Sequence, residues 1–456
     1  MLWLVAAALL QVQPEPDSAE KYDKFLFELA NTGRFLDARS LADAITKKYP
    51  GTKWSERAAP FLKENGVYRV VPIETTGPES NRLDLSFMAD GVSVEDRHQA
   101  QWEKECDTTI KTFFASEPMK EYRRFFNVYR INVVSKDERI NPNSGAQVTA
   151  LGGREEEDIT VDTMECARAA RATSSRDDLC FVNVRPAGNT HGKSGYGVAV
   201  AGGPRPTRYR VLHAWGHALA GLADETNQLG NRRRRPEEPP EAPNVSASDD
   251  PTKVPWKYWI AARLRDEKRA KTVDIIEGAA RMEKGAWRPV REDQCVMNQG
   301  QEYCPICREA LVLAMYTWVR PIETSTDWAV PVKAPAEIKL ALVQPSHRLV
   351  ADWFVEKTGE KKGADAPERD VFLKDGLRMR EGHLGPRTGL GPSWKPPAAE
   401  KAAGVSRDGG VEAFETSKLG KGRWKVTVVV SDPTDWVAHD PENLLKDTRT
   451  WIVDVE

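Results

Sequence analysis

The stretch VLHAWGHALAGLADE spans residues 211–225. Its apolar side chains recur with helical spacing, at Leu212, Trp215, Leu219 and Leu222. His213 and His217 are four residues apart, so they share another face of the same predicted helix. Gly221 is placed to end the helix, because glycine takes the left-handed conformation at little cost. The stretch therefore predicts a helix that presents two imidazole rings side by side.

This spacing is that of the zinc-binding pattern H-E-x-x-H, in which the glutamate activates a metal-bound water. Alanine, Ala214, stands at the glutamate position. The chain after the helix presents Asp224 and Glu225, and either carboxylate can complete a three-ligand site with an open fourth position. We take Asp224 as the third ligand and Glu225 as the reserve. The spacing by itself would favour the alternative that His213 and His217 are ordinary core histidines.

The composition is that of a globular protein. The chain has 456 residues, of which 40% are hydrophobic and 29% charged, so it is long enough for two or three domains. Lys and Arg number 66 against 68 Asp and Glu, which leaves a net charge of −2. This balance gives no electrostatic reason to expect nucleic acid as a partner.

The first ten residues form a short apolar run, and a polar segment with prolines continues as far as Pro16. That length is typical of a signal-peptide core, since a membrane span needs roughly 20 apolar residues. We therefore expect residues 1–16 to be a signal peptide and the protein to be exported, periplasmic or extracellular. The alternative is a buried terminal helix. No later segment approaches spanning length, so no transmembrane span is expected.

The cysteines agree with export, because an even number in an oxidising compartment favours disulfides. Disulfides are the first interpretation of these cysteines. The alternative is that the C-x-x-C pair at residues 304–307 forms half of a structural zinc site or a redox pair. No second C-x-x-C completes a four-cysteine site. The six residues are Cys106, Cys166, Cys180, Cys295, Cys304 and Cys307.

Hydrophobic patterning divides the rest of the chain into an α+β multidomain arrangement. Residues 17–67 are typical of a tetratricopeptide-like helix pair, which cannot bury its own faces and is expected to pack on the neighbouring domain. In residues 68–330 strands alternate with helices: residues 83–87 and 126–133 alternate like strands, and 94–114 has helical spacing. Residues 196–200 add a strand just before the histidine helix. Residues 331–456 have the strand spacing of a small immunoglobulin-like or fibronectin-like β-sandwich.

The order of motifs resembles that of the IgA peptidase family, metzincin-like zinc metallopeptidases whose active-site pattern runs approximately H-E-x-x-H-x-x-x-x-L-x-D-E-Y. The resemblance covers roughly residues 70–320 and rests on residues 211–225 together with other matches in order. Upstream these are Gly77-Pro78, Asp90-Gly91, Phe126-Asn127-Val128 and Asp162-Thr163; downstream they are Asn244-Val245-Ser246, the stretches 256–260 and 277–280, Trp287-Arg288-Pro289, Cys295-Val296-Met297 and the stretch 304–308.

This resemblance implies a metzincin-like domain that binds one zinc ion through His213, His217 and Asp224. It also implies that Met297 is the methionine of the turn beneath the metal, although a core methionine is the alternative. Ala214 and Thr226 replace the glutamate and the tyrosine of the family pattern. Both replaced residues are implied to act in catalysis, whereas the metal ligands are retained.

We therefore expect a pseudoenzyme: a zinc-binding protein with severely impaired peptide hydrolysis that acts by binding a polypeptide or cell-surface glycan. The alternative function is an active zinc metalloendopeptidase with a displaced general base. A third interpretation, a purely structural fold without metal, is also open.

Overall fold

A computed structural model describes most of the chain. The described residues are 21–26, 29, 35–59, 68–93, 96–135, 149–155, 158–170, 173, 179–185, 192–195, 197–203, 207–228, 236–263, 273–358, 389–402, 405–408 and 411–456. The expected signal peptide, residues 1–16, lies outside them.

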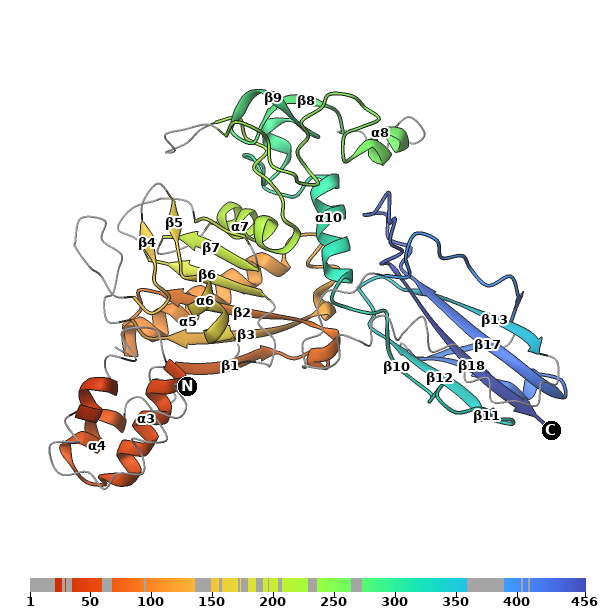
Figure 1. Cartoon of the computed structure of the whole chain (residues 1–456), viewed down its shortest axis with the longest axis horizontal. Coiled ribbons are helices and arrows are strands. Elements are labelled where there is room, and N and C mark those ends of the chain that lie inside the picture. The colour runs from red at the N-terminus through yellow and green to blue at the C-terminus, as the bar shows by residue number, and fades with distance from the viewer. Residues whose placement is uncertain are drawn as a thin grey trace.

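A five-stranded sheet with the order β1-β3-β2-β6-β7 forms the centre of the first half of the chain (Figure 1). Strand β1 is antiparallel to β3, and the other neighbours are parallel. Every residue of β2, β3, β6 and β7 is buried, as expected of parallel strands covered on both faces. The strands span Tyr68–Glu74 (β1), Leu83–Asp90 (β2), Phe126–Val133 (β3), Leu179–Val184 (β6) and Val198–Gly202 (β7).

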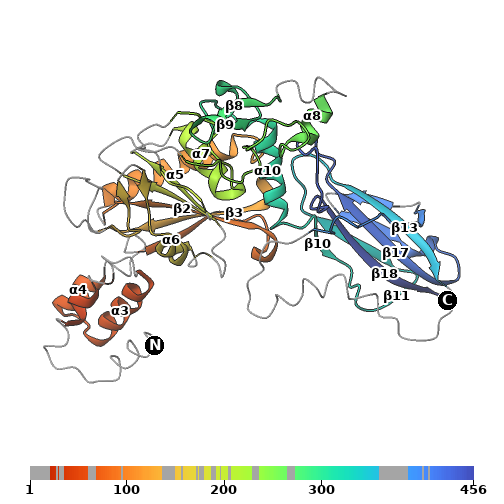
Figure 2. The same ribbon diagram turned by 45° about the horizontal axis from the view of Figure 1, so that its top comes forward.

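Helices cover both faces of this sheet. Helices α5 (Asp96–Phe114), α7 (Arg208–Ala220) and α10 (Pro305–Tyr316) pack together over one face and share its hydrophobic core. Helix α6 (Thr163–Ala170) lies on the opposite face (Figure 2). The predicted strands at 83–87 and 126–133 therefore lie within β2 and β3, and the helix predicted at 94–114 corresponds to α5, which begins at Asp96. Short elements complete this region: β4 (Arg154–Glu155), β5 (Ile159–Thr160), and 3-10 turns at Glu79–Asn81, Arg123–Phe125 and Glu292–Gln294.

The N-terminal helices pack against the second face of the sheet. Residues 21–26 are helical, and α3 (Phe35–Lys48) and α4 (Lys53–Ala58) come after them. Leu26, Ala42 and Ile45 are buried in the same hydrophobic cluster as Ile131 of β3 and Val182 of β6. The buried side chains of the helical segment thus share one hydrophobic cluster with the sheet.

A smaller lobe, which includes the described residues 221–228, 236–263 and 273–304, covers the end of α7 (Figures 1 and 2). It contains helix α8 (Lys257–Arg263) and a hairpin of β8 (Ile276–Ala279) and β9 (Met282–Arg288). Ala280 and Arg281 form the hairpin turn with φ of 51° and 63°. Their backbone N–H groups donate to the carbonyl oxygens of Asp224 and Thr226 at 2.8 and 2.7 Å, so the hairpin is fixed against the chain that leaves α7.

Two sheets form the C-terminal part, with the orders β10-β12-β16-β15 and β11-β18-β17-β13-β14. Trp353, Trp451 and Val428 of the second sheet share one hydrophobic core with Leu340 and Phe414 of the first. Strand β10 pairs with β12, so this part begins before the expected boundary at residue 331. The strands span Ile322–Ser325 (β10), Val332–Lys333 (β11), Glu337–Leu342 (β12), Val350–Thr358 (β13), Glu400–Lys401 (β14), Val405–Asp408 (β15), Val411–Glu415 (β16), Gly422–Ser431 (β17) and Lys446–Val455 (β18), with a 3-10 turn at Thr416–Lys418.

The cysteines differ from the sequence-based expectation. All six lie in described residues, and each is a buried free thiol, so the expected disulfides are wrong for this structure. Three of them, Cys295, Cys304 and Cys307, gather at one place, although the sequence spacing suggested only half of a site. None of the described helices combines the length and the apolar character needed to span a bilayer.

Candidate metal centre

Helix α7 forms as its sequence predicts. The Thr207 side chain caps its start by accepting a hydrogen bond from the Arg210 N–H, and the helix ends at Gly221 with φ of 60°. The Gly221 N–H donates to the His217 carbonyl at 3.2 Å. The left-handed turn directs the chain back along the helix, and this return brings Asp224 to the histidines.

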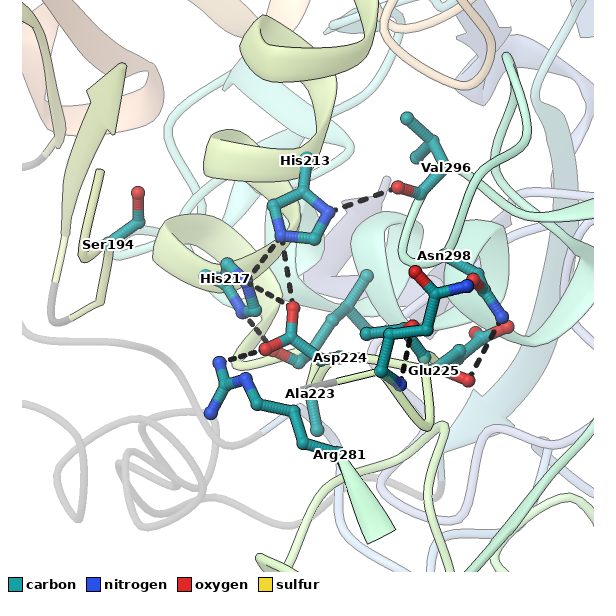
Figure 3. Close-up of polar contacts among 12 residues, drawn as sticks. Ser194, His213, His217, Ala223, Asp224, Glu225, Arg281, Val296 and Asn298 are labelled. Carbon is teal, nitrogen blue, oxygen red and sulfur yellow. Dashed lines mark hydrogen bonds and ion pairs between the residues drawn. The ribbon is translucent and has the colours of Figure 1, made fainter. Parts of the chain in front are cut away.

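Three ligand atoms meet at the end of α7 (Figure 3). The Nε2 atoms of His213 and His217 are 3.1 Å apart. Asp224 Oδ1 lies 3.0 Å from His213 Nε2 and 3.4 Å from His217 Nε2. The structure therefore brings the two histidines and the preferred third ligand together in the geometry of a metal site.

The outer nitrogens of both rings are held by backbone carbonyls. His213 Nδ1 lies 3.0 Å from the Val296 carbonyl oxygen, and His217 Nδ1 lies 2.5 Å from that of Leu222. A carbonyl only accepts hydrogen bonds, so each Nδ1 must carry the proton. In the neutral rings both Nε2 atoms are then unprotonated and face each other and a carboxylate. This arrangement is the one in which histidines bind a metal ion.

Arg281 is a further member of the site that sequence reasoning did not identify. Its guanidinium donates to Asp224 Oδ2, while Oδ1 faces the histidines (Figure 3). Burial acts to raise the pKa of the Asp224 carboxyl, but hydrogen bonds from the charged forms of His213 and His217, which also carry a proton on Nε2, outweigh it and hold that pKa well below its usual range. Arg281 lies 57 residues from Asp224 in the chain, and only the hairpin turn brings it there.

Glu225, the reserve ligand, points away from the histidines (Figure 3). Its side chain is fully buried, and its Oε1 accepts a hydrogen bond from Asn244 Nδ2 at 3.0 Å. Burial raises the pKa of this carboxyl well above its usual value. Its backbone N–H donates to the Met297 carbonyl at 2.8 Å. Neighbouring carboxylates therefore face opposite sides of one backbone segment.

Met297 is fully buried below α7. Its sulfur would lie 2.5 Å from a Cβ atom added at Gly216, so the absence of a side chain at Gly216 makes room for it. The turn that carries Met297 also provides the Val296 carbonyl that holds His213. The turn therefore supports the histidine helix from below.

Ala214 and Thr226 stand where the family pattern has a glutamate and a tyrosine, so these two positions supply neither a carboxyl group nor a phenol. Ala214 is 3% exposed and belongs to the hydrophobic core between α7 and its neighbours. Thr226 lines the cavity, and its hydroxyl oxygen accepts a hydrogen bond from the Gln228 N–H at 3.1 Å. Neither side chain supplies a group that titrates near neutral pH.

A cavity of about 1230 Å³ opens over the three ligands. Tyr209, one turn before His213, stacks on its ring with centroids 5.2 Å apart. Burial and the nearby Asp224 raise the pKa of the Tyr209 hydroxyl to about 12. The segment Gly192–Ser194 forms another wall, and Ser194 Oγ accepts from the backbone N–H of Val200 in β7 at 2.8 Å. The carboxylates of Asp158, Glu238 and Glu241 also line this cavity.

Comparison with known proteins gives one family. Residues 71–264 match the family model described as IgA Peptidase M64. The matched segment begins in β1, contains α7 with both histidines, and ends one residue after α8. No curated protein matches the chain. The match and the grouping of His213, His217 and Asp224 support a zinc metallopeptidase-like protein.

Proposed function

We propose that this chain is an exported, catalytically impaired relative of the IgA peptidases that binds one zinc ion through His213, His217 and Asp224. Its role is to bind a polypeptide or a cell-surface glycan in the cavity above that site. The observation that carries the proposal is the convergence of three ligand atoms within 3.4 Å of one another beside a position, Ala214, that offers no proton acceptor.

The ligand set fits zinc. Zn–N bonds of about 2.0–2.1 Å in a tetrahedron place neighbouring ligand atoms about 3.3 Å apart. The observed separations of 3.0, 3.1 and 3.4 Å agree with that value. Two histidines and one carboxylate leave a fourth position open, as in catalytic zinc sites. Arg281 and the two backbone carbonyls are the outer partners that orient such ligands.

The proton chemistry of hydrolysis is weak at this site. When bound, zinc lowers the pKa of its water and polarises a carbonyl. The general base that accepts a proton and passes it to the leaving amine contributes ~10²–10⁴ in rate. Ala214 has no such group, and Glu225 faces away from the histidines. We therefore expect the zinc frame to persist while peptide hydrolysis is reduced by at least that factor.

The remaining parts of the chain fit a binding role. The cavity is large enough for several residues of a polypeptide or for sugar rings. We propose that the C-terminal sheets form an immunoglobulin-like or fibronectin-like β-sandwich that binds or spaces. Residues 1–16 would direct export as a signal peptide.

One observation favours the alternative function, an active zinc metalloendopeptidase. Asp158, Glu238 and Glu241 line the same cavity as the histidines, so a displaced general base has three candidates. Measurement of proteolysis separates the two functions, because both of them require the zinc ion.

Loss of zinc and gain of cleavage in designed variants test the proposal. The double variant His213→Ala/His217→Ala should lose about one zinc ion per chain relative to wild type. Wild type should cleave unstructured polypeptides poorly, and Ala214→Glu should raise cleavage by ~10²-fold or more, since it restores a carboxylate. Ala214→Gln, which adds the same volume without the charge, is the matched control and should stay inactive.

Two results would contradict this proposal. Equal zinc content in wild type and the double variant would exclude the histidine site. Strong chelator-sensitive cleavage by wild type would establish the active enzyme instead. Loss of that cleavage in Asp158→Asn, Glu238→Gln or Glu241→Gln would then identify the base.

A further inference from the structure

A second cluster of metal-ligand side chains lies behind the histidine site. Among the described residues, this cluster and the histidine site are the groups with metal-ligand geometry. It consists of the carboxylate of Glu225 and the thiols of Cys295, Cys304 and Cys307, and all four side chains are fully or almost fully buried. The cluster is contributed by three separate segments of the smaller lobe and α10.

We propose that these four residues bind a second, structural zinc ion. Zn–S bonds of about 2.3 Å and Zn–O bonds of about 2.0 Å in a tetrahedron place two sulfurs about 3.8 Å apart and a sulfur and an oxygen about 3.5 Å apart. Cys295 Sγ and Cys307 Sγ are 3.6 Å apart. Glu225 Oε1 lies 3.1 Å from Cys307 Sγ and 3.7 Å from Cys304 Sγ. These three distances agree with a closed, four-coordinate site, and all four ligand atoms lie within 4.8 Å of one another.

The buried carboxyl of Glu225 has to bind either a proton or a cation. One of its oxygens, Oε2, is buried and has no hydrogen-bond partner among the residues that the structure describes. A buried carboxyl without a cation is normally protonated, whereas a buried carboxylate is normally paired with a cation or bound to a metal. No Lys or Arg contacts this carboxylate in the described structure, whereas three thiols do. A zinc ion would supply the missing positive charge.

The start of α10 offsets the excess negative charge of such a site. Three thiolates and one carboxylate carry two more charges than a zinc ion neutralises. Cys304 is the N-cap of α10, and Cys307 lies in its first turn. The unpaired N–H groups at a helix start favour thiolates there. Asn244 Nδ2 adds a hydrogen bond to the Glu225 carboxylate at 3.0 Å.

The second zinc would position the first site. Glu225 directly succeeds Asp224, and Cys295 precedes Val296, whose carbonyl holds the His213 ring. A zinc ion that joins Glu225 and Cys295 to α10 would therefore fix the backbone at Asp224, the third ligand of the first site. It would also fix the Met297 turn below α7. Cys295, Cys304 and Cys307 are not among the residues that line the cavity, so this zinc would be structural.

Zinc counts in matched variants test this inference independently of the proposed function. Wild type should hold about two zinc ions per chain, and Cys304→Ser/Cys307→Ser should hold about one or none. Cys106→Ser, which alters another buried cysteine, should retain both. A zinc ion lost only in the histidine double variant would overturn the second site and leave the first intact. A zinc ion lost only in the cysteine variant would overturn the histidine site and leave the cysteine site intact.

Cobalt and thiol measurements keep the test valid if the cysteine variant does not fold. The His213→Ala/His217→Ala chain, stripped of metal and reloaded with Co²⁺, should show the intense near-ultraviolet charge-transfer absorption of cobalt–thiolate bonds. All six cysteines should react with a thiol reagent after the protein is denatured with chelator. If the cobalt–thiolate absorption is absent, the site is overturned. It is also overturned if only four thiols react because Cys295 has formed a disulfide.

Discussion

Asp224 and Glu225 are neighbours in the sequence, and their side chains lie in different surroundings. Asp224 Oδ1 faces two histidines and its Oδ2 contacts Arg281. Glu225 lies among three thiols on the other side of the backbone. The two side chains leave opposite sides of the backbone, which is the reason for this division (Figure 3). The Arg281 contact is made by Oδ2, so Oδ1 is the oxygen that faces the histidines.

Arg281→Ala is expected to weaken zinc binding at the histidine site by about 10-fold to 100-fold, since outer partners that orient ligands have effects of that size. Competition with a chromogenic chelator would measure the affinity. Lys284→Ala, an exposed change on the same hairpin, is the control and should leave it unchanged. An unchanged or tighter affinity in Arg281→Ala would show that the guanidinium does not orient Asp224.

At the scale of the element, α7 depends on the turn packed below it. Gly216 lies on the buried side of the helix and faces the sulfur of Met297. The same turn accepts hydrogen bonds from His213 and from the Glu225 backbone. Close approach of helix and turn is therefore a condition for both the histidine orientation and the position of Asp224.

Gly216→Ala should destabilise the protein by about 1–3 kcal/mol, because the new methyl group overpacks a buried contact. Urea unfolding would measure the free energy of unfolding. The double variant Gly216→Ala/Met297→Ala frees that space. Its decrease in the free energy of unfolding should therefore be smaller than the sum of the decreases in the two single variants. Additive losses would mean that the methyl group does not meet Met297.

At the scale of the whole molecule, a polar network joins the C-terminal sheets to the first half of the chain. Asp432, at the end of β17, is buried and accepts hydrogen bonds from the hydroxyls of Tyr122 and Tyr316 at 2.8 and 2.6 Å. His347 lies between Asp432 and Glu121, with Nε2 2.6 Å from Asp432 Oδ1. These contacts cross between the parts and fix their junction.

The junction should weaken at high pH. Burial acts to lower the pKa of His347, but hydrogen bonds with Asp432 and Glu121 outweigh it and raise that pKa to about 9. A pKa raised above the ordinary value of about 6.5 gives stability that is complete below that value and is lost as the pH rises through about 9.

Thermal unfolding of wild type and His347→Gln would measure this effect. Wild type should be more stable by about 2 kcal/mol near pH 6, from hydrogen bonds between charged groups. The difference should shrink as the pH rises past about 9. A difference that is constant or grows with pH would contradict a charged His347.

The sequence alone determined the local features of this protein. The spacing of apolar residues and of His213 and His217, with Gly221 at the end, specifies a helix with two imidazoles on one face, because these interactions involve near neighbours. Alternation likewise located β2, β3 and the long C-terminal strands. The absence of a carboxylate at residue 214 is a direct property of the sequence.

Only the tertiary structure decided which distant groups meet. It brought Asp224, and not Glu225, to the histidines, and it placed Arg281 beside Asp224 across 57 residues. It gathered Cys295, Cys304 and Cys307 around Glu225, where sequence counting favoured disulfides. The physical reason is that such contacts depend on how the hairpin, the Met297 turn and α10 pack around one buried segment, and local periodicity carries no record of that packing.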